Sequence, residues 1–201
     1  MSNNLFFSER FDSIPENQIA ENIAKNSFFS YEKAVDPKII DKILSETELF
    51  KINLNSVHIS PVHHSSGYYH SNALAKSNTL FKFMTSKKIF EIARNYLGNE
   101  FRLKCHRVYS RNPIAKDSWH TDDKRYGNKF RIKGIVFIVY LNDVFNGEFQ
   151  AIKGSHLISE NYKYPDFHTD IVKKFNKDIV SFKLPLGSII IFDVLLWCYG
   201  T

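Results

Sequence analysis

The sequence has few of the features that mark secreted, membrane-spanning or low-complexity proteins. Its 201 residues include only two cysteines, Cys105 and Cys198, which excludes a disulfide framework. It contains no run of about 18 apolar residues, so a transmembrane helix is not expected. The N-terminal residues lack the basic and apolar segments of a secretory signal. We therefore expect a soluble, cytoplasmic protein without a membrane partner.

The chain also lacks a block of like charges, although it is basic overall. Its formal net charge is +6, but the lysines are spread from Lys25 to Lys183 and never form a run of five or six. A nucleic-acid partner is therefore not expected. The basic balance favours an anionic or amphipathic small molecule as the ligand.

The composition is that of one folded domain. Apolar residues make up 43% of the chain and aromatic residues 15%, enough to fill one core in a chain too short for two full domains. Internal repeats, low-complexity segments and interdomain linkers are absent from the sequence. We expect a single domain over residues 1–201, with a mostly helical region at 1–98 and a β region at 99–201.

Hydrophobic spacing changes between the two halves. The first half has apolar residues at helical intervals, with start signals before two of the segments and Gly98 as a C-terminal cap. Helices are predicted at residues 16–25, from Pro37 to Leu44, and from about 72 to 97. The second half has short runs typical of strands, at residues 101–109, 135–141, 148–152, 179–184 and 188–196. Asn, Asp, Gly and Pro loops separate them, which favours an antiparallel barrel or jelly roll.

His120 and Asp122 form the most informative motif of the second half. Alternate residues of an extended segment point the same way, so this imidazole and this carboxylate can bind one cation. Both donors suit Fe(II), and a mononuclear non-haem iron site uses two imidazoles and one carboxylate while other positions stay open. We predict that His120 and Asp122 are two ligands of such a site.

Further motifs follow His120 and Asp122 in a recognisable order from about Arg102 onward. They are residues 119–122 (Trp-His-Thr-Asp), the strand end at 141–143 (Leu-Asn-Asp), 146–147 (Asn-Gly) followed by 154–156 (Gly-Ser-His), and 187–193 (Gly to Phe-Asp). This order resembles the phytanoyl-CoA dioxygenase family of Fe(II)/2-oxoglutarate oxygenases. The resemblance implies a mainly β fold with N-terminal helices: a double-stranded β-helix, related to the jelly roll and the cupins, with helices packed on one sheet. It also implies Fe(II) and 2-oxoglutarate as cofactors, O2 as a substrate, and hydroxylation of a small molecule.

Cys198 falls where the family has its distal histidine, the third iron ligand. Three interpretations stay open. The thiolate can bind the metal, since a metal ion lowers the thiol pKa. The thiol can instead be a buried core group, which would leave a non-catalytic jelly-roll binding protein that has lost its metal. His156 or another histidine can also complete the site.

The remaining candidates for ligand binding are weaker. In the family a basic residue on the next strand pairs with the far carboxylate of 2-oxoglutarate, and no Lys or Arg follows Lys183. The expectation is a C-terminally shortened chain whose last strand or strands are missing. Lys104 and His106 are candidates for holding the cosubstrate. His64 and His70, which we place in a polar aromatic loop, are candidates for touching the substrate.

Overall fold

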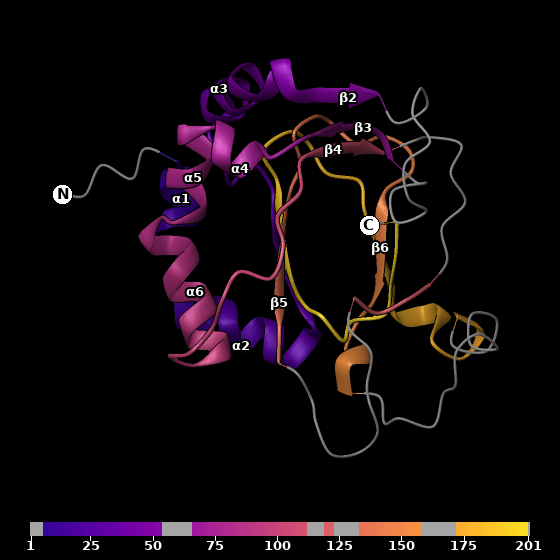
Figure 1. The fold of residues 1–201 in the computed structure, drawn as a ribbon. Coiled ribbons are helices and arrows are strands. Elements are labelled where there is room, and N and C mark those ends of the chain that lie inside the picture. Colours follow the sequence, from indigo (N-terminus) through magenta and orange to yellow (C-terminus); the bar gives the residue numbers. More distant parts are fainter. Residues whose placement is uncertain (1–5, 54–65, 112–118, 123–132, 158–171, 201) are drawn as a thin grey trace.

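The computed structural model describes residues 6–53, 66–111, 119–122, 133–157 and 172–200. Within these ranges a helical layer covers one side of the molecule, and the strands form three antiparallel sheets of three strands each (Figure 1). In the described ranges, none of the helices is both long and apolar enough to cross a bilayer.

The N-terminal half supplies the longer helices, and capping residues explain where several of them begin and end. The α-helices are α1 (Glu9–Asp12), α2 (Glu16–Asn26), α3 (Pro37–Thr47), α4 (Ala73–Lys76), α5 (Asn78–Met84) and α6 (Lys87–Leu97). Short 3-10 turns are η1 (Glu48–Phe50), η5 (Ser155–Leu157) and η6 (Asn176–Asp178). The Asp36 side chain accepts a hydrogen bond from Lys38 N at the start of α3. The first two predicted helices are confirmed, whereas the third region divides at Ser77 and Ser86, the N-caps of α5 and α6.

The first sheet lies between the helices and the second sheet (Figure 1). It contains β1 (Phe28–Tyr31), β8 (Ile189–Asp193) and β5 (Ile135–Val139), in the order β1-β8-β5. Every residue of β8 is buried, because both faces of this central strand are covered. Ile189 and Ile191 pack in the core beneath the helices, whereas Ile190 and Phe192 pack in the core on the opposite face.

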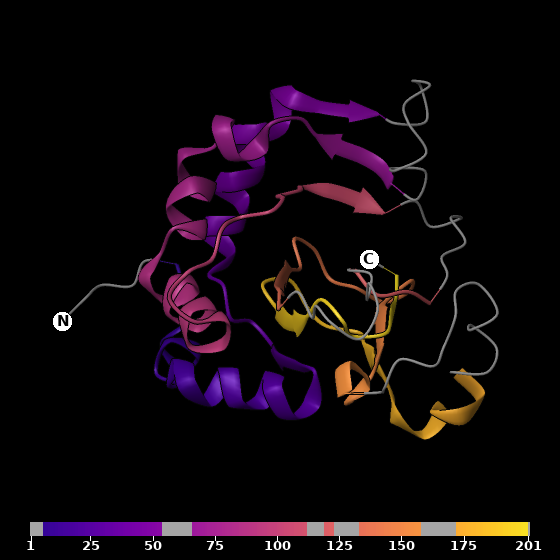
Figure 2. The same cartoon turned by 60° about the horizontal axis from the view of Figure 1, so that its bottom comes forward.

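The second sheet faces the first (Figures 1 and 2). It contains β6 (Phe149–Ile152), β7 (Ile179–Phe182) and β9 (Cys198–Tyr199), in the order β7-β6-β9. Aromatic rings join the two sheets: the ring centroids of Phe149 and Phe192 lie 5.2 Å apart. The helices therefore cover one face of the first sheet, and the second sheet covers the other.

The third sheet was not predicted by the sequence. It contains β2 (Lys51–Asn53), β3 (Ser66–His70) and β4 (Tyr109–Arg111), in the order β2-β3-β4. The interpretation of the segment around His70 as a loop is therefore wrong for residues 66–70. The strand predicted at 101–109 is also wrong for most of its length, because only Tyr109 belongs to a strand. Residues 101–106 alternate between apolar and polar side chains, but a strand also requires a neighbouring strand to which its backbone can bond.

The fold class is mixed α and β, not mainly β. Strands β1, β2 and β3 all lie in the half of the chain for which only helices were predicted. Conversely, many of the described residues in the second half, for which a β structure was predicted, belong to no strand. The expectation of helices packed on one sheet agrees with the structure, since β1 and β8 contact α2.

Candidate metal centre

Backbone pairing brings His120 and Cys198 together. His120 N donates to Cys198 O, and Cys198 N donates to His120 O, both at 2.9 Å. On its other side Cys198 pairs with Ala151 of β6. Directly opposed residues of an antiparallel pair present their side chains on the same face. Residues 78 positions apart in the chain therefore place an imidazole beside a thiol.

Asp122 completes a group of three possible metal ligands. The Asp122 Oδ1 atom lies 3.7 Å from His120 Nε2, and the Cys198 Sγ atom lies 4.0 Å from the same nitrogen. All three donor atoms lie within 4.8 Å of one another. The side chains of His120 and Asp122 are 30% and 29% exposed, whereas Cys198 is fully buried. The group therefore lies at the edge of the second sheet, with two of its three side chains partly exposed.

The arrangement of the three groups does not fit a nucleophilic triad. In such a triad the base contacts the nucleophile through one ring nitrogen and the orienting acid through the other. Here the thiol and the carboxylate both approach Nε2 of His120. The three donor atoms converge on one another, which is the arrangement that a shared cation requires.

The thiol of Cys198 is not ionised by its surroundings alone. Burial raises its pKa, the nearby His120 lowers the pKa part of the way back, and the Asp122 carboxylate raises it further. A divalent cation in contact with the sulfur would favour the thiolate, because a metal charge reverses this balance. The donor set of one imidazole, one carboxylate and one thiol therefore fits a divalent metal ion, and only the thiol departs from the two-imidazole pattern.

The Gly154-Ser155-His156 turn supports the centre from outside. Trp197 N donates a hydrogen bond of 2.8 Å to Ser155 Oγ, just before Cys198. His156 Nε2 lies 2.9 Å from Ala24 O of α2. The turn therefore joins the second sheet to the helical layer. His156 is engaged with α2, and it does not belong to the group of donors around His120.

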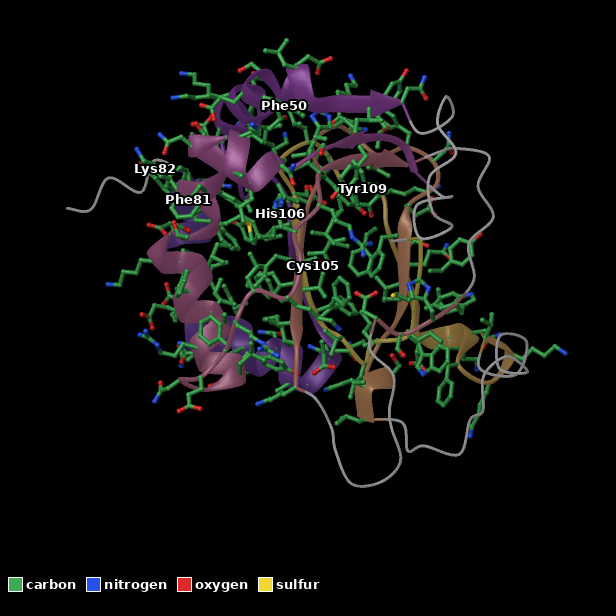
Figure 3. All side chains as sticks on the ribbon, in the orientation of Figure 1. Phe50, Phe81, Lys82, Cys105, His106 and Tyr109 are labelled. Atoms are coloured by element: carbon green, nitrogen blue, oxygen red, sulfur yellow. The ribbon has the colours of Figure 1, made fainter. Side chains whose placement is uncertain are left out.

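The weaker candidates do not belong to the group of donors around His120. His106 is half-buried on the segment that runs from α6 to β4 (Figure 3). Lys104, on the same segment, is exposed. Burial lowers the pKa of His106 and so favours its neutral form. His70 is buried in β3, with Nδ1 2.9 Å from Thr47 Oγ1, so it packs within the fold. His64 lies outside the described residues.

Asp193, the aspartate of the Phe-Asp pair in the 187–193 motif, is buried and has a structural role. Asp193 ends β8 and is 5% exposed. Its Oδ2 accepts a hydrogen bond from the Tyr96 hydroxyl of α6, and its Oδ1 accepts one of 2.7 Å from Leu195 N. Tyr96 and Asp193 line a cavity of about 580 Å³ between α2, α6 and the end of β8. His120, Asp122 and Cys198 do not line this cavity, which lies on the helical face of the first sheet.

Comparison with known proteins gives a family and several structural relatives. The family model for phytanoyl-CoA dioxygenase (PhyH) matches residues 28–200. No curated protein matches the chain.

The solved structures that resemble this one are distant in sequence. A non-haem α-ketoglutarate-dependent carbocyclase, SnoK of nogalamycin biosynthesis, has a TM-score of 0.68 at 13% identity, over 94% of this chain and 78% of its own. The epimerase SnoN, solved with Fe³⁺, α-ketoglutarate and nogalamycin RO, has a TM-score of 0.62 at 14% identity, over 92% and 77%. AviO1 from Streptomyces viridochromogenes has a TM-score of 0.59 at 13% identity, over 94% and 88%. At this level of identity the likeness shows the fold alone.

Proposed function

Since this chain belongs to the phytanoyl-CoA dioxygenase family, we propose that it is an Fe(II)/2-oxoglutarate-dependent oxygenase that hydroxylates a small molecule. His120 and Asp122 are the proposed iron ligands. The observation that carries the proposal is the separation of 3.7 Å between His120 Nε2 and Asp122 Oδ1, at the rim of two facing sheets. We infer that these sheets form the double-stranded β-helix of the family.

The two ligands have separate tasks. His120 offers an imidazole nitrogen, and its backbone bonds to Cys198 hold the segment against the second sheet. Asp122 supplies the negative charge that attracts a divalent cation, and its partial exposure leaves a path from solvent. When bound, iron together with 2-oxoglutarate and O2 supplies the oxidation of a C–H bond, and the cosubstrate is decarboxylated to succinate.

The core behind the site keeps water out of one side. Phe149, Phe182 and Phe192 pack between the two sheets together with Cys198. Exclusion of water strengthens the attraction between charged groups and protects reactive species. The substrate and cosubstrate therefore have to approach from the side on which His120 and Asp122 are exposed.

Lys104 is the proposed partner of a cosubstrate carboxylate. A lysine ammonium carries the positive charge that a dianion requires. Burial lowers the pKa of His106 and favours its neutral form, which makes it the weaker candidate of the pair. His64 and His70 stay proposals as substrate contacts, although the burial of His70 speaks against direct contact.

The experiment that tests this function measures iron and succinate together. Protein loaded with Fe(II) without O2 should hold one iron per chain and, on addition of O2 and 2-oxoglutarate, release succinate. Asp122→Ala should lower iron affinity at least about a hundredfold, because loss of even an outer-shell partner of a metal site costs about 10–100-fold. Asp178→Asn, at an exposed acid beside the second sheet, is the matched control and should behave as wild type. Iron binding unaffected by Asp122→Ala would refute the assignment.

A second candidate is a non-catalytic binding protein with the same fold. The buried, neutral thiol of Cys198 in place of an imidazole favours it. This candidate predicts no iron retention and no succinate release in the same experiment. Recovery of iron binding in Cys198→His would show that the scaffold still supports a metal centre.

A further inference from the structure

We propose that Cys198 is a metal ligand in its thiolate form, and that it makes the centre prefer Zn²⁺ over Fe²⁺ more strongly than a histidine there would. The inference rests on the proposed metal site at His120 and Asp122. It deepens that proposal in two ways: it assigns the third ligand, and it proposes that competition between Zn²⁺ and Fe²⁺ regulates the site.

The separations between the donor atoms leave room for one metal ion between the three groups, since all three lie within 4.8 Å of one another. Around a tetrahedral ion with bonds of 2.0–2.3 Å, nitrogen, oxygen and sulfur donors lie about 3.3 to 3.6 Å apart. At right angles around an ion the same bonds would place them about 3.0 Å apart. The separations from His120 Nε2 are 3.7 Å to Asp122 and 4.0 Å to Cys198, which are closer to the tetrahedral values. Small side-chain movements would bring the donors to bonding distance.

The backbone holds the sulfur in position. Cys198 pairs with His120 on one side and with Ala151 on the other, so the backbone fixes the direction of its Cα–Cβ bond toward the face that His120 shares. The residue is fully buried, and its core neighbours include Phe149 and Phe192. A donor that is already in place loses little freedom when it binds a metal.

The charge of the donor set differs from that of a two-histidine site. A carboxylate and a thiolate bring two negative charges, so a divalent ion at this centre becomes formally neutral. With a second imidazole in place of the thiolate, the same ion would keep one positive charge. Soft thiolate ligands select Zn²⁺, whereas the hard carboxylate does not discriminate in this way. The thiol proton passes to solvent when the metal binds.

The charge difference also affects the cosubstrate. A dianion such as 2-oxoglutarate is attracted less by a neutral metal centre than by a positive one. Wild type should therefore bind 2-oxoglutarate more weakly than Cys198→His. Zinc and a weakly held cosubstrate would both keep the centre inactive until iron is supplied in excess.

Cobalt absorption is the direct test, because a thiolate bound to Co²⁺ gives a charge-transfer band that imidazole and carboxylate do not give. The band should appear on titration of wild type with Co²⁺ and of Cys105→Ser, which removes the other, exposed cysteine. It should be absent from Cys198→Ser and Cys198→His. Competition between Zn²⁺ and Fe²⁺, measured without O2, should show that Cys198→His lowers the preference for zinc at least about tenfold.

The outcomes separate this inference from the proposed function. Co²⁺ binding by wild type without the charge-transfer band, and with equal affinity in Cys198→Ser, would overturn thiolate ligation but leave the His120 and Asp122 site in place. An unchanged zinc preference in Cys198→His would overturn the proposed selectivity. Failure of both wild type and Cys198→His to bind any metal would overturn both proposals. Circular dichroism of each variant, with Cys198→Ala as a second substitution, shows whether the fold has survived.

Discussion

Polar groups lie on both sides of the first sheet, but they are arranged in different ways. On the helical side, Asp193 accepts hydrogen bonds from Tyr96 and Leu195. At the rim of the facing sheets, the side-chain donors of His120, Asp122 and Cys198 approach one another only to 3.7 Å or more. The first arrangement is satisfied within the protein, and the second has the spacing of groups that share a cation.

The comparison teaches how the same chemical groups acquire different roles. A buried carboxylate stabilises a fold when donors lie at hydrogen-bond distance, because it then loses little on leaving water. The donor atoms of Asp122 and Cys198 lie 3.7 and 4.0 Å from His120 Nε2 and make only long contacts with it, so they gain more from an ion placed between them. We expect substitutions on the helical side to affect folding, and substitutions at the rim to affect metal binding.

The largest effect on folding is expected at Lys88 of α6. This residue is 2% exposed; its ammonium donates to Asp12 O and Ile14 O and pairs with Glu16 at 3.1 Å. Lys88→Met should lower the free energy of unfolding by about 3 kcal/mol, because two carbonyls and a carboxylate lose their partner. Urea denaturation measures the change. Lys87→Met, at the exposed neighbour, should change it by less than about 0.5 kcal/mol.

Tyr96→Phe should have the next largest effect. The hydroxyl donates to the buried Asp193, and its loss should cost about 2 kcal/mol. Burial, followed by the Asp193 carboxylate, raises the pKa of Tyr96 above its usual value of 10.0. Since the unfolded chain then ionises first, wild-type stability should fall as pH rises above 10, and the variant should lose that dependence. Tyr31→Phe, which keeps a packed ring, is the control. Equal stabilities of wild type and Tyr96→Phe would contradict the structural role.

A smaller effect is expected from Glu46→Gln. Glu46 accepts hydrogen bonds from Ser77 Oγ at 2.6 Å and from Thr79 Oγ1 at 2.7 Å, and these two bonds are the main reasons that its pKa lies below 4.5. The stabilisation is present above pH 4.5 and is lost as pH falls through the lowered pKa. Because the carboxylate is partly exposed, we expect only about 1 kcal/mol. Acid unfolding curves should show a shallower dependence in the variant than in Glu48→Gln.

The smallest effect on folding is expected at the rim itself. His120→Ala keeps the backbone bonds to Cys198, so the metal-free protein should change in stability by no more than about 0.5 kcal/mol. Added metal should raise the melting temperature of wild type and leave that of the variant unchanged. A large loss of stability in the metal-free variant would show that His120 stabilises the fold, as Asp193 does. The proposed difference between the two sides of the first sheet would then be wrong.

Part of the candidate site could be predicted from local spacing. His120 and Asp122 are two residues apart, so their convergence follows from the alternation of side chains along an extended segment. Cys198 entered through the resemblance to a family, because no local pattern connects it to residue 120. The strand predicted around residues 188–196 was right for β8, whose buried apolar run is distinctive.

Other features could not be predicted because they depend on distant partners. β3 was taken for a loop, since its Ser, Gly and Tyr residues become a strand only between β2 and β4. The contact between Tyr96 and Asp193 joins residues 97 positions apart. The spacing of apolar residues shows which face of a helix or strand is buried. It does not show which other helix or strand packs against that face.

By itself the sequence determined which residues can bind a metal and which segments are helical, because ligand chemistry and helical period are local properties. Only the tertiary structure decided that Cys198 meets His120 and Asp122, while Asp193 meets Tyr96. Both outcomes depend on the register of β8 and β9 within their sheets, where a shift of one residue would turn each side chain to the opposite face.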